Sequence, residues 1–254
     1  MMEARKHRYT LMIDLDLCDG CGACSVACAI ENNVATPPAE AGTRKSVVPL
    51  RVERVVHRRG EDVDEVFVPI MCQQCQHHTP CVQVCPQTAV DLDPETGIVS
   101  QIVDRCLGCR YCMAACPYHT RSFNWWQPRW DDLLAEHLAP DVPVRQRGVV
   151  EKCNLCHGRW QRARAAAARE GRREPDRADM VPACAEACPR GAIQWFDALD
   201  PDDPLHETAH GERAFVLLER LGTAPSVTYL SSRAWVRRID DPAVFDPETE
   251  VSHA

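Results

Sequence analysis

The sequence predicts an α+β protein in which one small cysteine-rich domain is inserted into another, with loop-rich extensions. Sixteen of the 254 residues are cysteine, and they fall into four groups without remainder. The stretch between the second and third groups has the pattern of a β-hairpin, and the first and fourth groups flank the other two. Only five Phe and four Tyr are present, so the apolar core is modest. We therefore expect bound metal to organise the fold.

Composition and charge exclude several other classes of protein. A formal net charge of −8 argues against a free nucleic-acid-binding protein, which usually carries a basic surface. No uninterrupted apolar stretch approaches the roughly 20 residues that cross a bilayer. The N-terminal stretch MMEARKHRYTLMIDLDLC has neither an apolar signal core nor a twin arginine. Taken alone, the chain is predicted to be cytoplasmic, unless it is exported while bound to a partner that carries the signal.

The four cysteine groups share one spacing pattern. The first and third read C-x2-C-x2-C-x3-C, the second widens one gap to five residues, and the fourth widens it to 27. Proline follows the last cysteine of every group except the first, where Ala29 follows Cys28. The groups are Cys18, Cys21, Cys24 and Cys28; Cys72, Cys75, Cys81 and Cys85; Cys106, Cys109, Cys112 and Cys116; and Cys153, Cys156, Cys184 and Cys188.

This spacing favours iron–sulfur clusters over zinc or disulfides. Three thiolates two residues apart let a tight loop wrap one cubane, and the fourth cysteine points to the neighbouring cluster of a two-cluster ferredoxin. Zinc sites need pairs of C-x2-C and leave the third and fourth cysteines of each group unexplained. Cysteines crowded this closely are poor disulfide partners, and no secretion signal is present. A zinc-stabilised binding module remains the alternative from another class.

If the fourth cysteine of each group binds the cluster of a neighbouring group, the four groups must form pairs. The second and third groups are adjacent, and AVDLDPETGIVSQIV between them alternates and turns at 93–97, as a β-hairpin does. The first and fourth groups are then left for each other. The predicted fold is thus two ferredoxin-like two-cluster [4Fe–4S] domains, one inserted into the other. The predicted ranges are 8–60 with 145–200 for the outer domain, 61–130 for the inserted domain, and 201–254 for a C-terminal extension.

Four hypothetical ligand sets follow, and they use all sixteen cysteines in four [4Fe–4S] clusters. Site 1 is Cys18, Cys21, Cys24 and Cys188; site 2 is Cys153, Cys156, Cys184 and Cys28; site 3 is Cys72, Cys75, Cys81 and Cys116; site 4 is Cys106, Cys109, Cys112 and Cys85. Basic residues beside these ligands either raise the reduction potentials of the clusters or are merely solvated. They are Arg105, Arg110, Lys152 and Arg190.

Three further segments have recognisable patterns. Residues 158–177 are rich in Ala and Arg and predict a helix inserted within the fourth group. Residues 197–212 are acidic and contain proline, which indicates a loop or linker. Residues 240–254 are expected to form a mobile tail, or an arm that orders on a partner. No Gly-rich phosphate loop opens a helix, and no nucleophile has a nearby base, so no substrate site is expected.

With these residues in place, the chain resembles the four-cluster iron–sulfur subunit of complex iron–sulfur molybdoenzymes of the dimethyl sulfoxide, polysulfide and tetrathionate reductase type. The resemblance covers roughly residues 8–235. It rests on IDLDLCDGCGACSVACAIEN, MCQQCQHHTPCVQVCP, DRCLGCRYCMAACPYHTRSFNWW, VEKCNLC and PACAEACPRGAI. The stretch LLERLGTAPSVTYL also resembles iron–sulfur subunits of quinone reductases and of alternative complex III.

The resemblance implies a non-catalytic electron-transfer subunit. It implies a molybdopterin catalytic subunit (Mo or W) at site 1, a quinone-interacting membrane subunit at site 4, and peripheral attachment to the membrane through these partners. Nitrate-reductase-like members carry Trp where this chain has Cys109, which argues against that branch. A second hypothesis keeps the four clusters but replaces the catalytic partner with a [NiFe] hydrogenase or a formate dehydrogenase.

Overall fold

The computed structural model describes residues 6–38, 41, 47–240 and 250–253. The strands are β1 Tyr9–Asp14, β2 Leu50–Arg59, β3 Asp62–Met71, β4 Val90–Leu92, β5 Val99–Gln101, β6 Ser122–Phe123, β7 Val150–Glu151, β8 Ile193–Asp197, β9 Ala214–Phe215, β10 Thr228–Leu230 and β11 Glu250–His253. The α-helices are α1 Ala23–Glu31, α2 Pro80–Gln83, α3 Tyr111–Ala115, α4 Asp132–Ala135, α5 His157–Arg169, α6 Ala183–Glu186 and α7 His206–Ala209. Short 3-10 turns span Val103–Arg105, Arg177–Met180, Glu219–Leu221 and Val236–Arg238.

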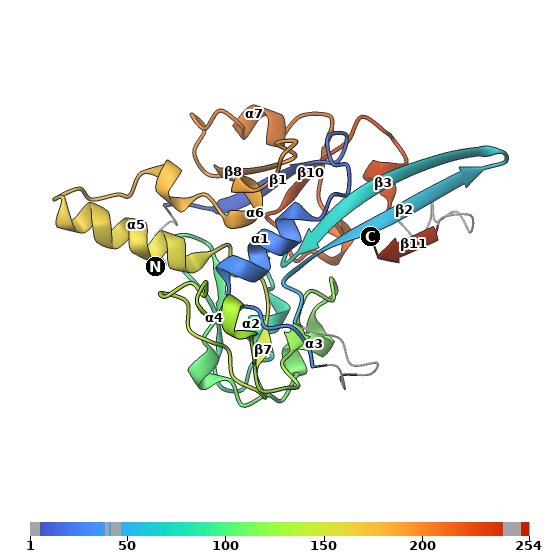
Figure 1. Cartoon of the computed structure of the whole chain (residues 1–254). Coiled ribbons are helices and arrows are strands. Elements are labelled where there is room, and N and C mark those ends of the chain that lie inside the picture. The colour runs from blue at the N-terminus through green and yellow to red at the C-terminus, as the bar shows by residue number, and fades with distance from the viewer. Residues whose placement is uncertain (1–5, 39–40, 42–46, 241–249, 254) are drawn as a thin grey trace.

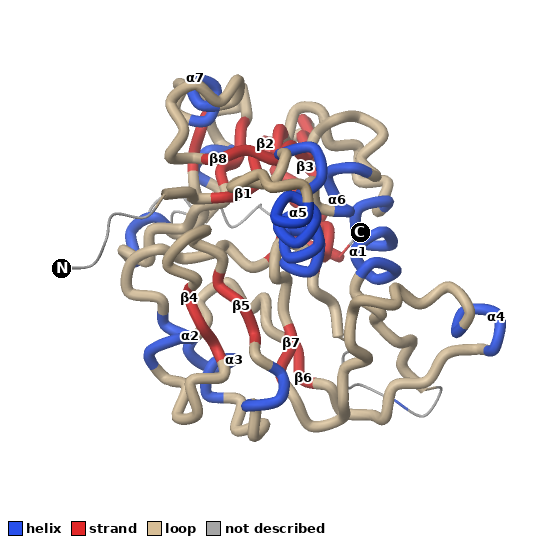
Figure 2. The backbone as a smooth tube through the Cα atoms, turned by 90° about the vertical axis from the view of Figure 1, so that its left-hand side faces the viewer, coloured by secondary structure: helices blue, strands red, loops and turns tan. Residues whose placement is uncertain are grey.

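The described residues confirm the predicted α+β class and divide into an upper and a lower part (Figure 1). The upper part holds the sheet β8-β1-β10-β9 and the sheet β11-β2-β3, together with α1, α5 and α6. The lower part holds α2, α3 and the short pairs β4-β5 and β6-β7, which lie below β1 and α5 (Figure 2). The second and third cysteine groups therefore lie mainly in the lower part.

Strand β1 lies in the interior of the upper sheet, and its apolar run LMI suits that position. Five of its six residues are buried. It pairs antiparallel with β8, where Leu11 lies opposite Trp195, and parallel with β10, where Ile13 lies opposite Tyr229. Strands β9 and β10 belong to the predicted C-terminal extension, 201–254. That segment therefore completes the sheet around β1.

A long hairpin, β2–β3, projects from the upper part (Figure 1). Its strands pair from Leu50 opposite Met71 to Arg59 opposite Asp62. The boundary predicted between residues 60 and 61 falls in the turn of this hairpin. Strand β11 pairs antiparallel with the outer edge of β2, which corrects the expectation of a mobile tail for residues 250–253. Residues 241–249 and 254 of that predicted tail lie outside the described residues.

The hairpin predicted between the second and third cysteine groups is confirmed. Strand β4 pairs antiparallel with β5, with Val90 opposite Gln101. The turn is closed by the side chain of Asp93, whose Oδ1 accepts hydrogen bonds from the backbone N–H of Glu95 at 2.8 Å and of Thr96 at 3.0 Å. Side-chain capping of this kind is the reason Asp is favoured in turns.

Proline ends the helix in three of the four cysteine groups. Helices α2, α3 and α6 stop two or three residues before Pro86, Pro117 and Pro189, because the residue before proline is disfavoured in the helical region. In the first group, Ala29 stands in place of proline and α1 continues to Glu31. Cys28 is therefore inside a helix, whereas the fourth cysteines of the other groups lie beyond one.

In each C-x2-C turn, the residue directly before the second cysteine lies in the left-handed backbone region. The residues are Gly20 (φ +75°), Gln74 (φ +50°), Gly108 (φ +74°) and Leu155 (φ +49°). This conformation costs roughly 1–2 kcal/mol for a residue with a Cβ atom, which explains glycine in two of the four turns. The repeated conformation reverses the chain tightly enough to bring two thiols to one side.

The helix predicted over 158–177 is shorter than expected. Helix α5 ends at Arg169, and Gly171 follows in the left-handed region at φ +73°. The backbone N–H of Arg172 then donates to the carbonyl of Ala167 at 2.9 Å, which is the hydrogen bond of a Schellman C-cap. The glycine therefore stops a helix that the Ala-rich composition would otherwise extend.

The acidic segment 197–212 consists mostly of turns, as the loop prediction expected, with the short helix α7 within it. It is not a free linker, because part of it is anchored in the fold. The side chain of Asp203 is 1% exposed and forms an ion pair with Arg177. Its Oδ2 also accepts a hydrogen bond from the backbone N–H of Asp197 at 2.9 Å. An acidic composition indicates exposure only when no cation is placed to pair with the carboxylates.

Arg159 of α5 ties together the elements that carry the first and fourth cysteine groups. Its guanidinium contacts Glu31 at the end of α1 at 2.7 Å and Glu186 of α6 at 2.6 Å. It also donates to the carbonyl of Val181 at 2.8 Å. Burial opposes ionisation of Glu31, but the hydrogen bonds from Arg159 outweigh it and hold the pKa of Glu31 below its usual value.

Substitution Gly108→Ala should disrupt the third cysteine turn. The new Cβ would lie 2.2 Å from the carbonyl oxygen of Gly148, a backbone atom that cannot rotate away. We expect iron bound per chain to fall. The control is Gly22→Ala, which has the same φ of +74° but no atom within 4 Å of the new Cβ. Equal iron content in the two variants would contradict the role of the close approach.

Substitution Arg159→Ala should destabilise the packing of α5 against α1 and α6 by about 1–3 kcal/mol, because the largely buried carboxylate of Glu31 loses its shortest hydrogen bond and keeps only the longer contact with Arg162. The shift of the urea midpoint, followed by absorbance of the bound clusters, measures this. Since the pKa of Glu31 is lowered, its contribution is present above its usual pKa of 4.5 and is lost as pH falls below it.

The matched control is Arg162→Ala on the same helix. Arg162 also contacts Glu31, at 3.2 Å, but its side chain is 42% exposed, so its contribution should stay below about 1 kcal/mol. Equal losses in the two variants would show that Arg159 has no special role.

Candidate metal centres

Two cavities in the lower part are each lined by four cysteines drawn from both the second and third groups. One is lined by Cys72, Cys75, Cys81 and Cys116. The other is lined by Cys85, Cys106, Cys109 and Cys112. In each cavity, three cysteines of one group are joined by the fourth cysteine of the other group. These are the residues named as sites 3 and 4.

The first and fourth groups also meet, although about 130 residues of sequence separate them. The pKa of Cys18 is raised first by burial, and Cys188 and Cys21 add to the effect. The pKa of Cys28 is also raised first by burial, but the cysteines that add most to it are Cys153 and Cys156. Helices α1 and α6 pack against each other, which brings the two groups together.

Packing of the cysteines supports an order of the sites along one row. Cysteines of sites 1, 2 and 3 lie in one buried cluster, and Cys81 of site 3 lies in a second cluster with cysteines of site 4. Within the first cluster, Cys24 of site 1 adds to the raised pKa of Cys28 of site 2, and Cys72 of site 3 adds to that of Cys153 of site 2. These neighbours support the order site 1, site 2, site 3, site 4.

Burial makes these thiols reluctant to ionise without metal. It raises the pKa of Cys24 to about 11 and the pKa of Cys75 and of Cys153 to about 12, and neighbouring cysteines add to the effect. Burial also raises the pKa of Cys28 and Cys184 well above the usual value. Because iron binds thiolates, its positive charge must offset this cost, so metal binding and folding are coupled.

Hydrogen-bond donors reach several of the sulfurs. Donors to cysteine Sγ are the backbone N–H of Ala89 (to Cys85, 3.2 Å), of Leu155 (to Cys153, 3.4 Å) and of Val150 (to Cys106, 3.5 Å), and the side-chain amide of Asn32 (to Cys28, 3.6 Å). Donors of this kind stabilise negative charge on thiolate ligands and help set cluster potentials.

The donor set fits [4Fe–4S] clusters. Each of two cavities offers four thiols and mostly apolar walls, and N–H groups point at ligand sulfurs. A cubane requires this: four thiolates, one for each of four irons, in surroundings with few competing donors. Among the residues that the structure describes, no group of three His, Cys, Asp or Glu side chains is placed to hold a single metal ion.

The four basic residues noted beside the ligands differ in burial. Arg105 and Arg110 are exposed, and the side chain of Arg190 is 60% exposed. Lys152 is only 4% exposed. Solvent screens the charges of the three arginines, so Lys152 is the one of the four with a strong field at the sites.

Sequence reasoning missed Arg121. It follows Cys116 by five residues, too far to be adjacent to a ligand in the sequence, yet it is 5% exposed and lines the site 3 cavity. The feature of the sequence that could have pointed to Arg121 is that it is the single arginine in the otherwise uncharged run YHTRSFNWW, which follows the third group.

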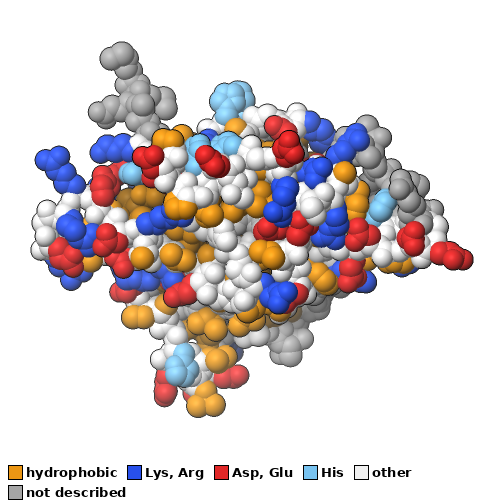
Figure 3. Space-filling view, turned by 90° about the horizontal axis from the view of Figure 1, so that it is seen from above, with side chains coloured by type: hydrophobic (Ala, Val, Ile, Leu, Met, Phe, Trp, Pro, Cys, Tyr) orange, Lys and Arg blue, Asp and Glu red, His pale blue; other side chains and the backbone are white. Residues whose placement is uncertain are grey.

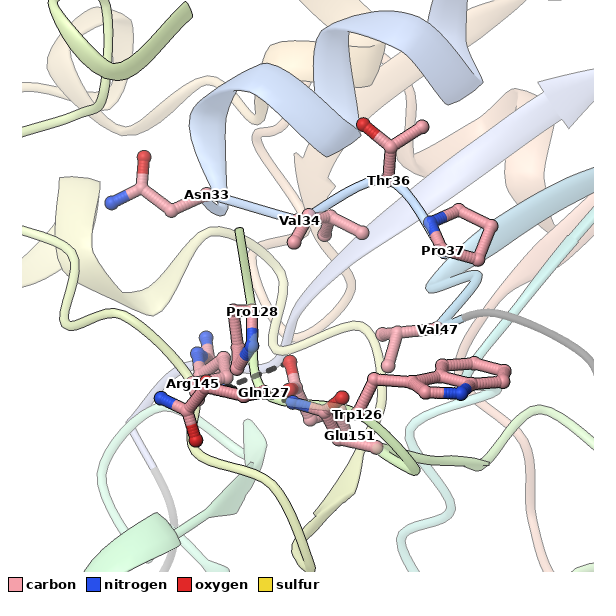
Figure 4. A pocket seen from close by; sticks show the side chains of 12 residues that line it. Asn33, Val34, Thr36, Pro37, Val47, Trp126, Gln127, Pro128, Arg145 and Glu151 are labelled. Carbon is pink, nitrogen blue, oxygen red and sulfur yellow. Dashed lines mark hydrogen bonds and ion pairs between the residues drawn. The ribbon is translucent and has the colours of Figure 1, made fainter. Parts of the chain in front are cut away.

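A further cavity contains no cysteine (Figure 4). Arg145 and Glu151 face each other there across 3.7 Å, and Trp126 lies beside them. Burial raises the pKa of Glu151 to about 7, against the opposing charge of Arg145. Asn33 borders the same cavity and donates to backbone carbonyls of the chain before β7. The cavity is thus a junction between the chain that leaves α1 and the chain that enters β7.

The surface seen from above carries acidic and basic side chains intermingled with apolar ones (Figure 3). Exposed apolar side chains also occur close to ligand positions, including Val26 (60%) on α1 and Leu107 (56%) and Tyr111 (64%) in the third group. In the described part of the chain, every helix is too short or too polar to span a bilayer.

Comparisons with known proteins agree with this chemistry. A family model described as a 4Fe-4S dicluster domain matches residues 63–132. The iron-sulfur cluster-binding subunit of menaquinone reductase from Nitratidesulfovibrio vulgaris is 48% identical over 240 residues, which are 93% of each chain.

Two other relatives are more distant. Iron-sulfur subunit 1 of an Hdr-like menaquinol oxidoreductase from Archaeoglobus fulgidus is 35% identical over 88% of this chain and 83% of the relative. A tetrathionate reductase subunit from Salmonella typhimurium is 33% identical over 89% of this chain and 73% of the relative. These matches span nearly all the cysteine-bearing sequence. The chain therefore belongs to the family of [4Fe–4S] electron-transfer subunits of complex iron–sulfur molybdoenzymes and related quinone reductases.

Proposed function

We propose that this protein holds four [4Fe–4S] clusters at sites 1 to 4 and relays electrons between a molybdopterin catalytic subunit and a quinone-interacting membrane subunit. One observation carries the proposal: the exposed cysteines are Cys21 of site 1 and Cys109 of site 4, the two ends of the row. The cysteines of sites 2 and 3 are buried, apart from the partly buried Cys116. Electrons would thus enter and leave at the ends and be insulated between them.

The proposed ligand sets have independent support at each site. The two cysteine-lined cavities support sites 3 and 4, in which Cys116 and Cys85 cross between groups. The neighbouring cysteines of Cys18 and Cys28 support sites 1 and 2, in which Cys188 and Cys28 cross. A crossed pairing also explains why two groups always lie together, since each one completes the site of its neighbour.

The nested domain arrangement is part of the same proposal. The match of a dicluster domain to residues 63–132 supports an inserted unit close to the predicted 61–130. The packing of α1 against α6 supports an outer unit built from both flanks of the insertion.

The chain's own residues supply binding and insulation. When bound, [4Fe–4S] clusters accept and donate single electrons. The thiols hold them in fixed positions, and buried apolar residues exclude water. Val90, Val99 and Val150 pack with Cys81 and Cys112 in the lower part. Little movement of solvent then accompanies each charge transfer.

The proposed partners follow the family and the names of relatives. Relatives named as menaquinone reductase and menaquinol oxidoreductase subunits support a quinone-interacting partner. A relative named as a tetrathionate reductase subunit supports a catalytic reductase partner. We propose that the protein attaches peripherally to the cytoplasmic membrane through these partners.

Substitution Cys116→Ser tests the crossing of ligands. We expect EPR and iron counting to show damage to the cluster of Cys72, Cys75 and Cys81, with the cluster of Cys106, Cys109 and Cys112 intact. The mirror variant Cys85→Ser should show the opposite pattern. Damage from Cys116→Ser that is confined to the third group's own cluster would show that the ligands do not cross.

Purification of the native complex tests the partners and the metals. We expect about sixteen iron atoms and as many acid-labile sulfides per chain, with molybdenum or tungsten in a companion subunit identified by mass spectrometry. Nickel would instead indicate a hydrogenase partner. A colourless chain with zinc and no labile sulfide would contradict the electron-transfer function itself.

A further inference from the structure

Arg121 is a buried cation at the boundary between sites 3 and 4. It is 5% exposed and lines the site 3 cavity. Its Nη1 donates to Gln101, which lines the site 4 cavity, and Cys81 of site 3 and Cys112 of site 4 pack in one cluster. The residue therefore lies between two neighbouring sites.

The hydrogen bonds of Arg121 leave its charge uncompensated. Nη1 donates to Oε1 of Gln101 at 3.0 Å, and Nε2 of Gln101 donates to the carbonyl of Ala89 at 2.9 Å, which fixes the orientation of the amide. Nε and Nη2 are buried and have no oxygen or nitrogen partner among the described residues. Such an arginine is costly to bury unless an anion lies near it.

Cysteines share the site 3 cavity with Arg121, among them Cys72 and Cys81. These thiols become thiolates when they bind iron, and they then supply the negative charge that a carboxylate supplies for most buried arginines. A bound cluster adds further negative charge at the same place.

A second buried cation, Lys152, lies between sites 2 and 3. Its ammonium donates to three neutral oxygens, of Val99, of Cys153 at 2.8 Å and of Asn154 at 3.3 Å. Its charge acts on Cys81 of site 3 and on Cys153 of site 2. Site 3 therefore has a buried cation toward each neighbouring site, whereas the arginines noted near the outer sites are exposed.

We propose that Arg121 raises the reduction potentials of the clusters at both site 3 and site 4, as a charge-compensating residue shared between them. The inference rests on the proposed ligand sets. The reduced form of a cluster carries one more negative charge than the oxidised form, and a fixed cation in a poorly solvated site stabilises that form more. Because Arg121 lies between the two sites, its removal acts on two clusters together.

The test is a redox titration of the cluster-loaded complex with dithionite and mediators, monitored by EPR. In Arg121→Gln, we expect the two clusters at sites 3 and 4 to lose at least about tenfold in their equilibrium constant for reduction, which is a negative shift of about 59 mV for one electron. The clusters at sites 1 and 2 should keep their midpoints. Arg121→Lys, which keeps the charge, should restore most of the shift.

The matched control is Arg105→Gln. It removes the same charge next to Cys106 of site 4, but from an exposed position, so its shift should be much smaller. Unchanged midpoints in Arg121→Gln with full iron content would overturn the proposal. Equal shifts in Arg121→Gln and Arg121→Lys would also overturn it, since packing rather than charge would then be the cause.

The iron content of the two variants distinguishes the outcomes in which clusters are lost. If Arg121→Gln does not retain its clusters while Arg121→Lys retains them with wild-type midpoints, the charge is required and the proposal stands. If both variants lose them, the side chain acts through packing and the proposal fails. If the proposed ligand sets are wrong, a separate result will show it: Cys116→Ser will damage only the cluster of Cys106, Cys109 and Cys112.

Discussion

Each proposed cubane needs four thiolates, and in the proposed ligand sets no single cysteine group supplies all four to one site. Because the fourth cysteine of each group is proposed to cross to a neighbour, a site would be complete only when two segments of chain meet. For sites 3 and 4 the short hairpin β4–β5 achieves this, since it returns the chain directly from the second group to the third. For sites 1 and 2, the packing of α1 against α6 and the bridge of Arg159 to Glu31 and Glu186 serve the same purpose over a much longer distance.

Local backbone devices prepare each group for this meeting. One residue with positive φ precedes the second cysteine of every turn, whether it is glycine, as at 20 and 108, or not, as at 74 and 155. Proline then ends three of the four short helices, and its absence after Cys28 lets α1 run on to Glu31. That extra length is what brings Glu31 within reach of Arg159. The one departure from the cysteine pattern is therefore connected to how the outer segments dock.

Charge is the second constraint on such a protein. The chain is acidic, with a formal net charge of −8, and clusters with four thiolates add negative charge to its interior. Two buried cations, Arg121 and Lys152, lie where adjacent sites approach each other. Neither pairs with a carboxylate through the hydrogen bonds described, so their charges are directed at the cysteines. In the proposed relay, buried apolar residues such as Val90 and Val99 insulate the middle of the row, and these two cations compensate its charge.

The sequence by itself determined the chemistry: sixteen cysteines at iron–sulfur spacing, the β4–β5 hairpin and the α+β class, because ligand spacing and turn residues act over a few positions. Composition misjudged the end of α5, where a C-cap glycine stops the helix, and it gave no sign that Asp203 would be buried against a distant arginine. Only the tertiary structure placed β10 beside β1 and brought Arg121 between two sites. Those contacts join residues far apart in the chain, and no local pattern encodes which distant residue a buried side chain will meet.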